Sequence, residues 1–164
     1  MDIAIEAGPR PGIAGLVSAL QARYYAREWG FGAVFEAKIT HGMAEFLARY
    51  DPGRDVILSS WQGDRLLGSV TLDGSDPGNP PGTAHLRWFI VDAAARGAGL
   101  GRRLITRALG FGRETGKDAV YLWTFDGLRA ARALYDEAGF ELVEQHVGTT
   151  WGTPVTEQRF VLRL

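Results

Sequence analysis

The chain has 164 residues and a formal net charge of −1 at pH 7, with 46% hydrophobic and 23% charged residues. This composition is that of an average soluble domain, and it excludes a chain that is mainly disordered. The charge balance also excludes a strongly basic surface that would gather nucleic acid or an anionic membrane. A chain of this length can bury one hydrophobic core, so we expect a single domain over residues 1–164.

Hydrophobic residues recur every three or four positions in four segments, which predicts helices, and they alternate or run together in seven others, which predicts strands. The expected elements are a strand at 2–7, helices at 13–29 and 35–50, strands at 56–61 and 65–72, a loop at 73–83, a strand at 85–91, a helix at 100–115, a strand at 119–124, a helix at 130–138, and strands at 140–147 and 155–164. This order predicts a mixed α/β fold.

Two details of this pattern carry further expectations. The segments 85–91 and 119–124 are nearly unbroken apolar sequence, which is typical of strands that are buried on both faces. The first helix is expected to bury an apolar stripe made of Ile13, Leu16, Val17, Leu20 and Tyr24.

A glycine-rich turn separates an expected strand from an expected helix. It reads Ala95-Arg96-Gly97-Ala98-Gly99-Leu100-Gly101-Arg102-Arg103. Glycines allow the backbone to approach a ligand, and the first N–H groups of a helix have no partner within it. Together with the helix dipole, these groups form a site for a phosphate or pyrophosphate, beside which the arginines add positive charge. A plain turn with solvent-exposed arginines is the alternative.

Two familiar phosphate-binding loops do not fit this turn. The ATP-type loop requires a lysine after its last glycine, and none follows here. The dinucleotide-binding loop requires a third glycine at position 102, which is Arg102. That loop also normally lies in the first strand–helix–strand unit of a chain, whereas this turn follows several strands.

The turn resembles the acyl-CoA-binding motif of the GNAT family of N-acetyltransferases, which runs Gln or Arg, two residues, Gly, one residue, and Gly or Ala. Arg96, Gly99 and Gly101 fill this motif, after a strand that ends at Val91. A second family motif is matched by Ala131, Leu134, Tyr135, Gly139 and Phe140. One residue departs from it, because Leu128 stands where the family usually has Asn.

The resemblance implies a fold and an activity. The fold would be α/β, with a mixed, mostly antiparallel central sheet of about seven strands flanked by four helices. The activity would be direct transfer of the acetyl group of acetyl-CoA, the co-substrate, to a primary amine of a small molecule or amino acid, without an acyl-enzyme. Family members often form dimers, which leaves a homodimer open. Residues 151–158 also look like the acetyltransferase half of proteins that fuse a MarR-type repressor to such a domain.

The resemblance further assigns the cofactor contacts. Backbone N–H groups from Gly97 to Gly101 would hold the pyrophosphate, and the exposed backbone of Phe89 and Val91 would pair with pantetheine as an extra strand does. The expected cofactor-binding residues are Phe89, Val91, Arg96, Gly97, Ala98, Gly99, Leu100, Gly101 and Arg102.

The reaction requires an acid and a base. Tyr135 stands at the position of the family's general-acid tyrosine, and a phenol with a pKa of about 10 keeps its proton at neutral pH. An alkylamine with a pKa of about 10.4 is neutral in only about one molecule in 2,500 at pH 7, so a base is useful. His85 and Asp126, at the mouth of the central strands, are the first candidates, followed by Glu36, His41 and Glu157.

The acceptor pocket is expected between the first two helices and the final hairpin. Its expected lining is Trp29, Phe31, Phe35, His41 and Trp151. Each of these residues has packing in the core or at the rim as its alternative role. Aromatic side chains suit an apolar or aromatic amine, and the near-neutral charge of the chain does not favour a strongly charged protein substrate.

Cysteine is absent, which removes disulfides, thiolate nucleophiles, zinc–thiolate sites and iron–sulfur clusters. His41, His85 and His146 lack the spacing of metal ligands, so no metal is expected. The sequence starts without a signal-peptide pattern, and no apolar run approaches 18 residues, which predicts a cytoplasmic protein without membrane contact.

Two other functions remain open at this stage. A non-catalytic acyl-CoA sensor on the same fold would explain Leu128 and the lack of an obvious base, and it predicts binding without turnover. A nucleotide-dependent oxidoreductase would bind NAD instead of CoA, and Arg102 argues against it.

Overall fold

The computed structural model describes residues 3–164. The elements are β1 (Glu6–Ala7), α1 (Ile13–Trp29), α2 (Ala33–Ala48), β2 (Val56–Gln62), β3 (Arg65–Asp73), β4 (Thr83–Val91), the short 3₁₀ helix η1 (Ala93–Ala95), α3 (Leu100–Glu114), β5 (Ala119–Phe125), α4 (Arg129–Ala138), β6 (Glu141–Gly148) and β7 (Val155–Arg163). The expected order of helices and strands is confirmed.

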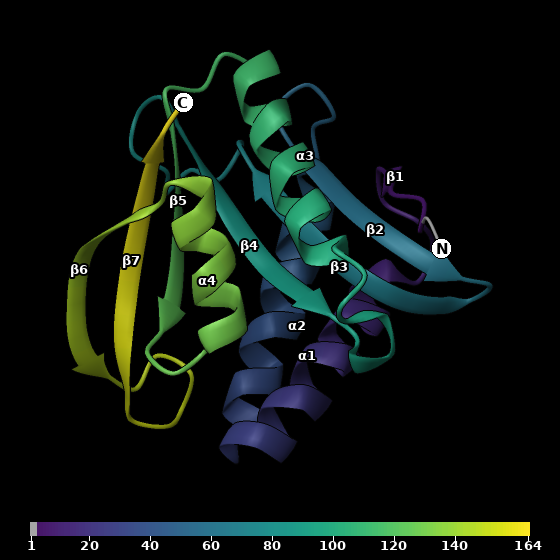
Figure 1. Cartoon of the computed structure of the whole chain (residues 1–164), viewed down its shortest axis with the longest axis vertical. Helices are drawn as coiled ribbons and strands as arrows, with labels where there is room; N and C mark the ends of the chain where they lie inside the picture. Colours follow the sequence, from purple (N-terminus) through teal and green to yellow (C-terminus); the bar gives the residue numbers. More distant parts are fainter. Residues whose placement is uncertain (1–2) are drawn as a thin grey trace.

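The strands form one seven-stranded sheet in the order β1-β2-β3-β4-β5-β7-β6. Every pair of neighbours is antiparallel except β4 and β5, which are parallel. Helices α1 and α2 lie on one face of the sheet, and α3 and α4 lie on the other (Figure 1). The expected α/β fold with a mixed, mostly antiparallel sheet and four helices is therefore confirmed.

Each face of the sheet has its own apolar core. On the α3 and α4 side, Leu104, Val120 and Phe160 are fully buried. On the α1 and α2 side, the buried cluster includes Val17 and Met43. The two helical layers hold the sheet between them, so its central strands are positioned rigidly.

The first strand is shorter than expected. Only Glu6 and Ala7 pair with β2, whereas the sequence predicted a strand over residues 2–7, of which Asp2 lies outside the described residues. The carbonyl oxygens of Ile3 and Ile5 accept hydrogen bonds from α3 instead, from Arg103 and Arg107 at 2.6 and 3.0 Å.

The inner face of α1 also differs from the expected stripe. Its buried residues are Ile13, Val17, Ser18 and Gln21, whereas Leu16 is 39% exposed. The expected apolar stripe was therefore wrong in part, because polar residues occupy positions on the side of α1 that packs against the sheet.

Strands β4 and β5 separate soon after they meet. They pair only where Thr83, Ala84 and His85 face residues 119–121, and beyond this point their ends point away from each other (Figure 1). Both strands were expected to be buried on both faces of the sheet. This prediction is confirmed for most of β5, but it is wrong for β4. Arg87, Trp88 and Phe89 are only partly buried, because no strand covers the open edge of β4.

A bulge in β4 adds to this opening. The register with β3 shifts between Ser69 and Thr71, and Trp88 has a φ of +54°. A bulky residue in the left-handed region is strained by about 1–3 kcal/mol, which surrounding contacts must offset. The Trp88 ring packs under the Arg87 guanidinium at 4.1 Å and near the Phe46 ring.

Two glycines of α3 test how closely this helix packs against the rest of the core. A Cβ on Gly110 would meet nothing within 4 Å, whereas a Cβ on Gly112 would lie 3.0 Å from Leu164 and 3.4 Å from Leu72. We expect Gly110→Ala to raise the free energy of unfolding by about 0.5–1 kcal/mol, since alanine favours the helix. Gly112→Ala should lose that gain to crowding. Urea unfolding measures both, and equal gains would contradict this packing.

Candidate active site

The glycine-rich turn forms a cradle of free backbone donors at the start of α3. Gly97 and Gly99 have φ values of +82° and +76°, and α3 begins at Leu100. The first helical hydrogen bond is donated by Arg103 N–H to the Gly99 carbonyl at 3.2 Å. Within residues 3–164, the N–H groups of residues 97–102 donate no hydrogen bond. These groups and the helix dipole suit an anionic ligand.

A cavity of about 480 Å³ adjoins this cradle. It is lined by Tyr24, Tyr25, Phe89, Ile90, Val91, Ala95, Arg96, Gly97, Gly99, Leu100, Gly101, Arg102, Gly127, Leu128, Arg129, Ala130, Ala131 and Leu134. Of the expected cofactor residues, only Ala98 is missing from this lining. Below, we call it the cradle cavity.

The arginines of the turn have different partners. Arg96 lies over the Tyr24 ring at 5.1 Å, and Arg102 pairs with Glu137 at 2.9 Å. Both arginines line the cradle cavity. Arg103 donates to the Ile3 carbonyl oxygen and does not line it. The Arg103 guanidinium is therefore held by the N-terminal segment and not by the wall of the cradle cavity.

Gly101 has a packing role as well. A Cβ at this position would lie 3.0 Å from Leu134 Cδ1 and 3.1 Å from Phe89 Cζ. The absence of a side chain lets α3 approach both α4 and β4 closely. This close approach forms one wall of the cradle cavity.

The free edge of β4 faces the gap between the two central strands. Asp92 N–H donates to the Leu67 carbonyl of β3 at 2.8 Å. Because hydrogen bonding alternates along an antiparallel pair, the backbones of Val91 and Phe89 face away from β3. The Gln21 side chain of α1 donates to the Phe89 carbonyl at 3.4 Å. An extended ligand can therefore pair along this edge.

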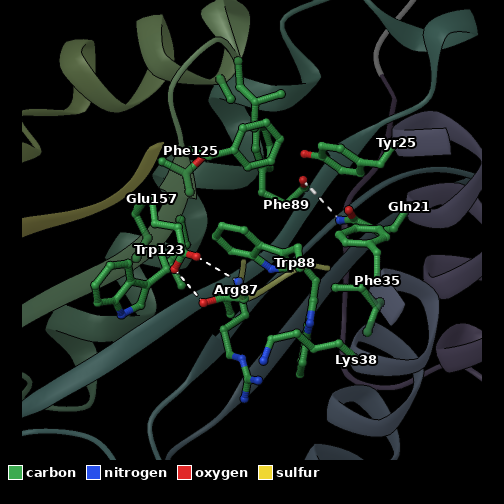
Figure 2. A pocket seen from close by; sticks show the side chains of 18 of the residues that line it. Gln21, Tyr25, Phe35, Lys38, Arg87, Trp88, Phe89, Trp123, Phe125 and Glu157 are labelled. Atoms are coloured by element: carbon green, nitrogen blue, oxygen red, sulfur yellow. Dashed lines mark hydrogen bonds between the residues drawn. The ribbon is translucent and has the colours of Figure 1, made fainter. Parts of the chain in front are cut away.

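A second cavity, of about 580 Å³, lies over the gap on the α1 and α2 side. We call it the acceptor-side cavity. Side chains from α1 and α2, among them Gln21, Tyr25, Phe35 and Lys38, lie on one side of it, and Trp123 and Glu157 lie on the other (Figure 2). Both cavities are lined by Tyr25, Phe89, Leu128 and Ala131. The two cavities therefore adjoin where β4 and β5 separate.

Tyr135 lines the acceptor-side cavity from α4. Its ring is buried between Phe89, Phe140 and Phe160, with centroid distances of 5.9–6.2 Å. Burial raises the pKa of its phenol above the usual value of 10.0. The phenol is therefore protonated at neutral pH and is able to donate a proton.

His85 lies at the closed end of the gap. Its ring stacks on Tyr121 at 4.4 Å, and its side chain is 17% exposed. Burial lowers its pKa below 6.5, although nearby Asp76, with Oδ2 at 4.0 Å from Nδ1, acts in the opposite direction. The Nδ1 atom is buried and has no hydrogen-bond partner among residues 3–164. At pH 7 the imidazole is neutral and is able to accept a proton.

The structure brings together only part of the expected acceptor site. Phe35 and Trp151 line the acceptor-side cavity, and Trp29 and His41 do not. His41 is exposed on α2, and Trp29 packs edge-on against Phe125 at 4.8 Å. The expected lining was wrong for these two residues and also for Phe31, which is buried and packs against Phe125.

Asp126 also lies outside the acceptor-side cavity. It is exposed just after β5, and its N–H donates to the Thr156 carbonyl at 2.9 Å. It lines a smaller cavity of about 200 Å³ together with Arg129 and Arg132. We therefore do not carry Asp126 into the mechanism.

Several residues of this site were missed by sequence reasoning, among them Gln21, Tyr25, Lys38, Trp88, His146 and Thr150. Gln21 and Tyr25 lie one helical turn apart on the inner side of α1, and both line the acceptor-side cavity. Burial raises the pKa of the Tyr25 phenol, and the neighbouring Tyr135 adds to this effect. The signal available in the sequence was Gln21, a polar residue on the mostly apolar side of the first helix.

Leu128 precedes α4 without a side-chain hydrogen bond to cap it. Its side chain packs against the apolar cluster beneath α1 and α2 and lines both cavities. Leu128 therefore places an apolar side chain at the junction of the two cavities.

Comparison with known proteins identifies the class of protein that this fold and site define. The sequence model of the acetyltransferase (GNAT) family matches residues 17–140. The chain belongs to the GNAT acetyltransferase family.

Two curated relatives are mycothiol acetyltransferases. The one from Beutenbergia cavernae is 33% identical over 130 residues, which cover 78% of this chain and 41% of the relative. The one from Geodermatophilus obscurus is 36% identical over 83 residues, which cover 49% of this chain and 27% of the relative. The chain thus spans less than half the length of these relatives.

Solved structures share the fold. A ribosomal-protein-alanine N-acetyltransferase from Brucella melitensis has a TM-score of 0.76 at 18% identity, covering 99% of this chain and 100% of that chain. A structure from Salmonella typhimurium that holds its cofactor acetyl-CoA has a TM-score of 0.75 at 19% identity, covering 99% and 94%. At these identities the likeness shows the fold alone.

No helix within residues 3–164 is both long and apolar enough to cross a membrane. In the same part of the chain, His, Asp and Glu side chains form no group of three or more arranged to hold a metal ion.

A matched pair of glycines tests the cradle with acetyl-CoA as the ligand. Gly99 and Gly116 have φ values of +76° and +77°, and a Cβ on either meets nothing within 4 Å. Gly99→Leu and Gly116→Leu should therefore destabilise the fold similarly, by about 1–2 kcal/mol.

Only Gly99 lines the cradle cavity. Only Gly99→Leu should therefore weaken acetyl-CoA binding, by about tenfold or more, because the new side chain blocks the backbone N–H donors. Titration calorimetry, with NAD as the control ligand, measures this. Equal affinities in both variants would exclude the cradle as the pyrophosphate site.

Proposed function

We propose that the chain is an N-acetyltransferase that transfers the acetyl group of acetyl-CoA directly to a primary amine of a small molecule or amino acid. The single observation that carries this proposal is the junction of two cavities at the point where β4 and β5 separate. One cavity offers free backbone donors for an anion, and the other is lined by groups able to donate or accept a proton. Membership in the GNAT family and the names of the curated relatives support the reaction class.

The residues present fit acetyl-CoA. The N–H groups of residues 97–102 suit its pyrophosphate, with Arg96 and Arg102 as nearby positive charges. The free edge of β4 at Phe89 and Val91 suits the amide groups of pantetheine. When bound, this co-substrate supplies an acetyl group that is activated as a thioester.

Tyr135 is the proposed general acid. The amine nitrogen forms a bond to the acetyl carbon, and the carbon–sulfur bond breaks with its electron pair left on sulfur. The Tyr135 phenol then gives its proton to that sulfur, and solvent restores the phenol. Burial keeps the pKa of this phenol high, so the proton is present when it is needed.

The amine must reach the acetyl carbon without its extra proton. Removing that proton from an alkylammonium at pH 7 costs about 4.6 kcal/mol, whereas an α-amino group near pKa 8 requires only about 1.4 kcal/mol. Four side chains that line the acceptor-side cavity are able to take it: His85, Glu144, His146 and Glu157. A base inside the cavity therefore favours alkylamine acceptors most.

Substitution of Tyr135 separates the enzyme from a non-catalytic acyl-CoA sensor, which Leu128 at the junction would also allow. We expect Tyr135→Phe to lower kcat by about 10²–10⁴-fold, as loss of a general acid does, and to leave acetyl-CoA affinity nearly unchanged. Thiol release measures turnover, and calorimetry measures binding. Unchanged turnover under conditions where chemistry is rate-limiting would remove Tyr135 from this role. Binding by the wild type without turnover of any amine would favour the sensor.

A further inference from the structure

We propose that the acceptor is a cationic primary amine on a flat apolar body, and that Glu157 binds its ammonium group and takes its proton. This inference rests on the proposed acetyltransferase function and specifies the substrate class of the same site. It depends on how Glu157 is held, where it lies along the gap, and what surrounds it.

Glu157 is a buried carboxylate with fixed partners. It lies on β7, and only 5% of its side chain is exposed. One carboxylate oxygen accepts a hydrogen bond from Thr150 N–H at 2.9 Å, and the other accepts one from Thr150 Oγ1 at 2.6 Å, as the dashed lines in Figure 2 show. A buried charge is costly unless it has partners, and these two hold it in one orientation. Each oxygen still has capacity for a further donor.

Glu157 lies toward the open end of the gap. In the sheet it pairs with Phe125, the last residue of β5. Strands β4 and β5 are in register where His85 faces Tyr121, so Phe125, four residues further along β5, lies beyond the end of that pairing. Phe89 belongs to the free edge proposed for pantetheine and lines both cavities. His85 lies four residues earlier on β4, at the end where the strands are still paired.

Aromatic side chains line much of the cavity that Glu157 also lines. Five of those that line the acceptor-side cavity are Phe35, Trp88, Trp123, Phe125 and Trp151. Aromatic faces attract cations as well as apolar surface, and tryptophan does so most strongly. A ligand with a flat apolar body could pack against these rings, and its ammonium group could pair with the Glu157 carboxylate.

The other charged groups near Glu157 carry both signs. His146 Nε2 lies 3.6 Å from Glu157, and Glu144 lies 4.0 Å from His146 Nδ1. Arg159, on β7, approaches Glu144 at 3.9 Å. Across the cavity, Lys38 is exposed on α2.

Arg87 does not supply a free positive charge to the cavity. Its guanidinium pairs with buried Asp73 at 3.0 Å and with Asp76 at 3.8 Å. The charge within the acceptor-side cavity that is both buried and anionic is therefore Glu157, and an anionic acceptor would be repelled by it.

His146 provides an exit for the proton. Its side chain is 51% exposed, so it connects the buried Glu157 with solvent. Glu157 takes one proton from the bound ammonium and passes it through His146 to solvent. Glu157 then takes the second proton as the nitrogen forms its bond to the acetyl carbon, while Tyr135 gives its own proton to sulfur. The second proton then leaves Glu157 through His146 to solvent, and solvent returns a proton to Tyr135. The net products are the amide, the free thiol and one released proton.

The test compares three probes of similar shape on the wild-type protein: 2-phenylethylamine, 2-phenylethanol and 3-phenylpropionate. Quenching of the cavity tryptophans and calorimetry measure binding without acetyl-CoA. We expect the amine to bind about tenfold or more tightly than the alcohol, and the carboxylate to bind more weakly than both. With acetyl-CoA present, the amine should be acetylated.

Glu157→Gln removes the charge and keeps the shape. The amide oxygen can still accept from Thr150 N–H, and the amide nitrogen can donate to Thr150 Oγ1. We expect this variant to lose about tenfold or more in affinity for the amine and a similar or larger factor in kcat/KM, with unchanged affinity for acetyl-CoA. Glu141→Gln is the matched control, because Glu141 is exposed on β6 and does not line either cavity.

A second variant keeps the proposal testable if Glu157→Gln does not fold. Thr150→Val removes the hydroxyl donor while the backbone N–H remains, and it should reduce kcat/KM for the amine with little change in acetyl-CoA affinity. Retained acetyl-CoA binding in each variant shows that the fold is intact. Should Glu157→Gln fail to fold, the result with Thr150→Val and the three wild-type probes decides the matter.

Three results would overturn the inference. The first is equal or tighter binding of 3-phenylpropionate, and the second is unchanged amine affinity and kcat/KM in Glu157→Gln. The third is that His85→Gln loses amine affinity and kcat/KM as expected for Glu157→Gln. This result would make His85 the group that takes the proton of the amine. Failure of the proposed function looks different, because the wild type would then bind no acetyl-CoA or acetylate no amine at all.

Discussion

Strands β4 and β5 pair over three residues and then separate, and the rest of the site depends on that opening. A continuous parallel pair would satisfy the backbone groups of β4 and leave no passage between the two faces of the sheet. Separation leaves the edge at Phe89 and Val91 free, and the two cavities adjoin across it. The two helical layers keep the gap open, since each buries its own apolar cluster against the sheet.

Burial at this junction controls its chemistry. Removal of water raises the pKa values of the Tyr25 and Tyr135 phenols and lowers that of the His85 imidazole, so all three are neutral at pH 7. Glu157 remains as a buried carboxylate held by Thr150. A buried carboxylate in such a site would attract a cation more strongly than it would in water, which is the basis of the proposed preference for an amine.

Most of the fold could be predicted from the sequence, because hydrophobic periodicity and glycine positions are local signals. The cradle was found in the same way, since a strand, a glycine turn and a helix are consecutive in the chain. The acceptor side was predicted only in part. Phe35 and Trp151 line the cavity, but Trp29 and His41 do not, because a residue's neighbours depend on how its helix is rotated against the sheet. Gln21 and Tyr25 were missed for the same reason.

The sequence by itself determined the order of the elements, the free donors at the start of α3 and the membership in the GNAT family. It also placed Tyr135 on a helix that packs against the sheet. Only the tertiary structure decided that Glu157 stands at the open end of the gap while His85 stands at the closed end, and that Asp126 lies outside both cavities. These relations join strands that are far apart in the chain, and register between such strands is set by packing across the whole sheet.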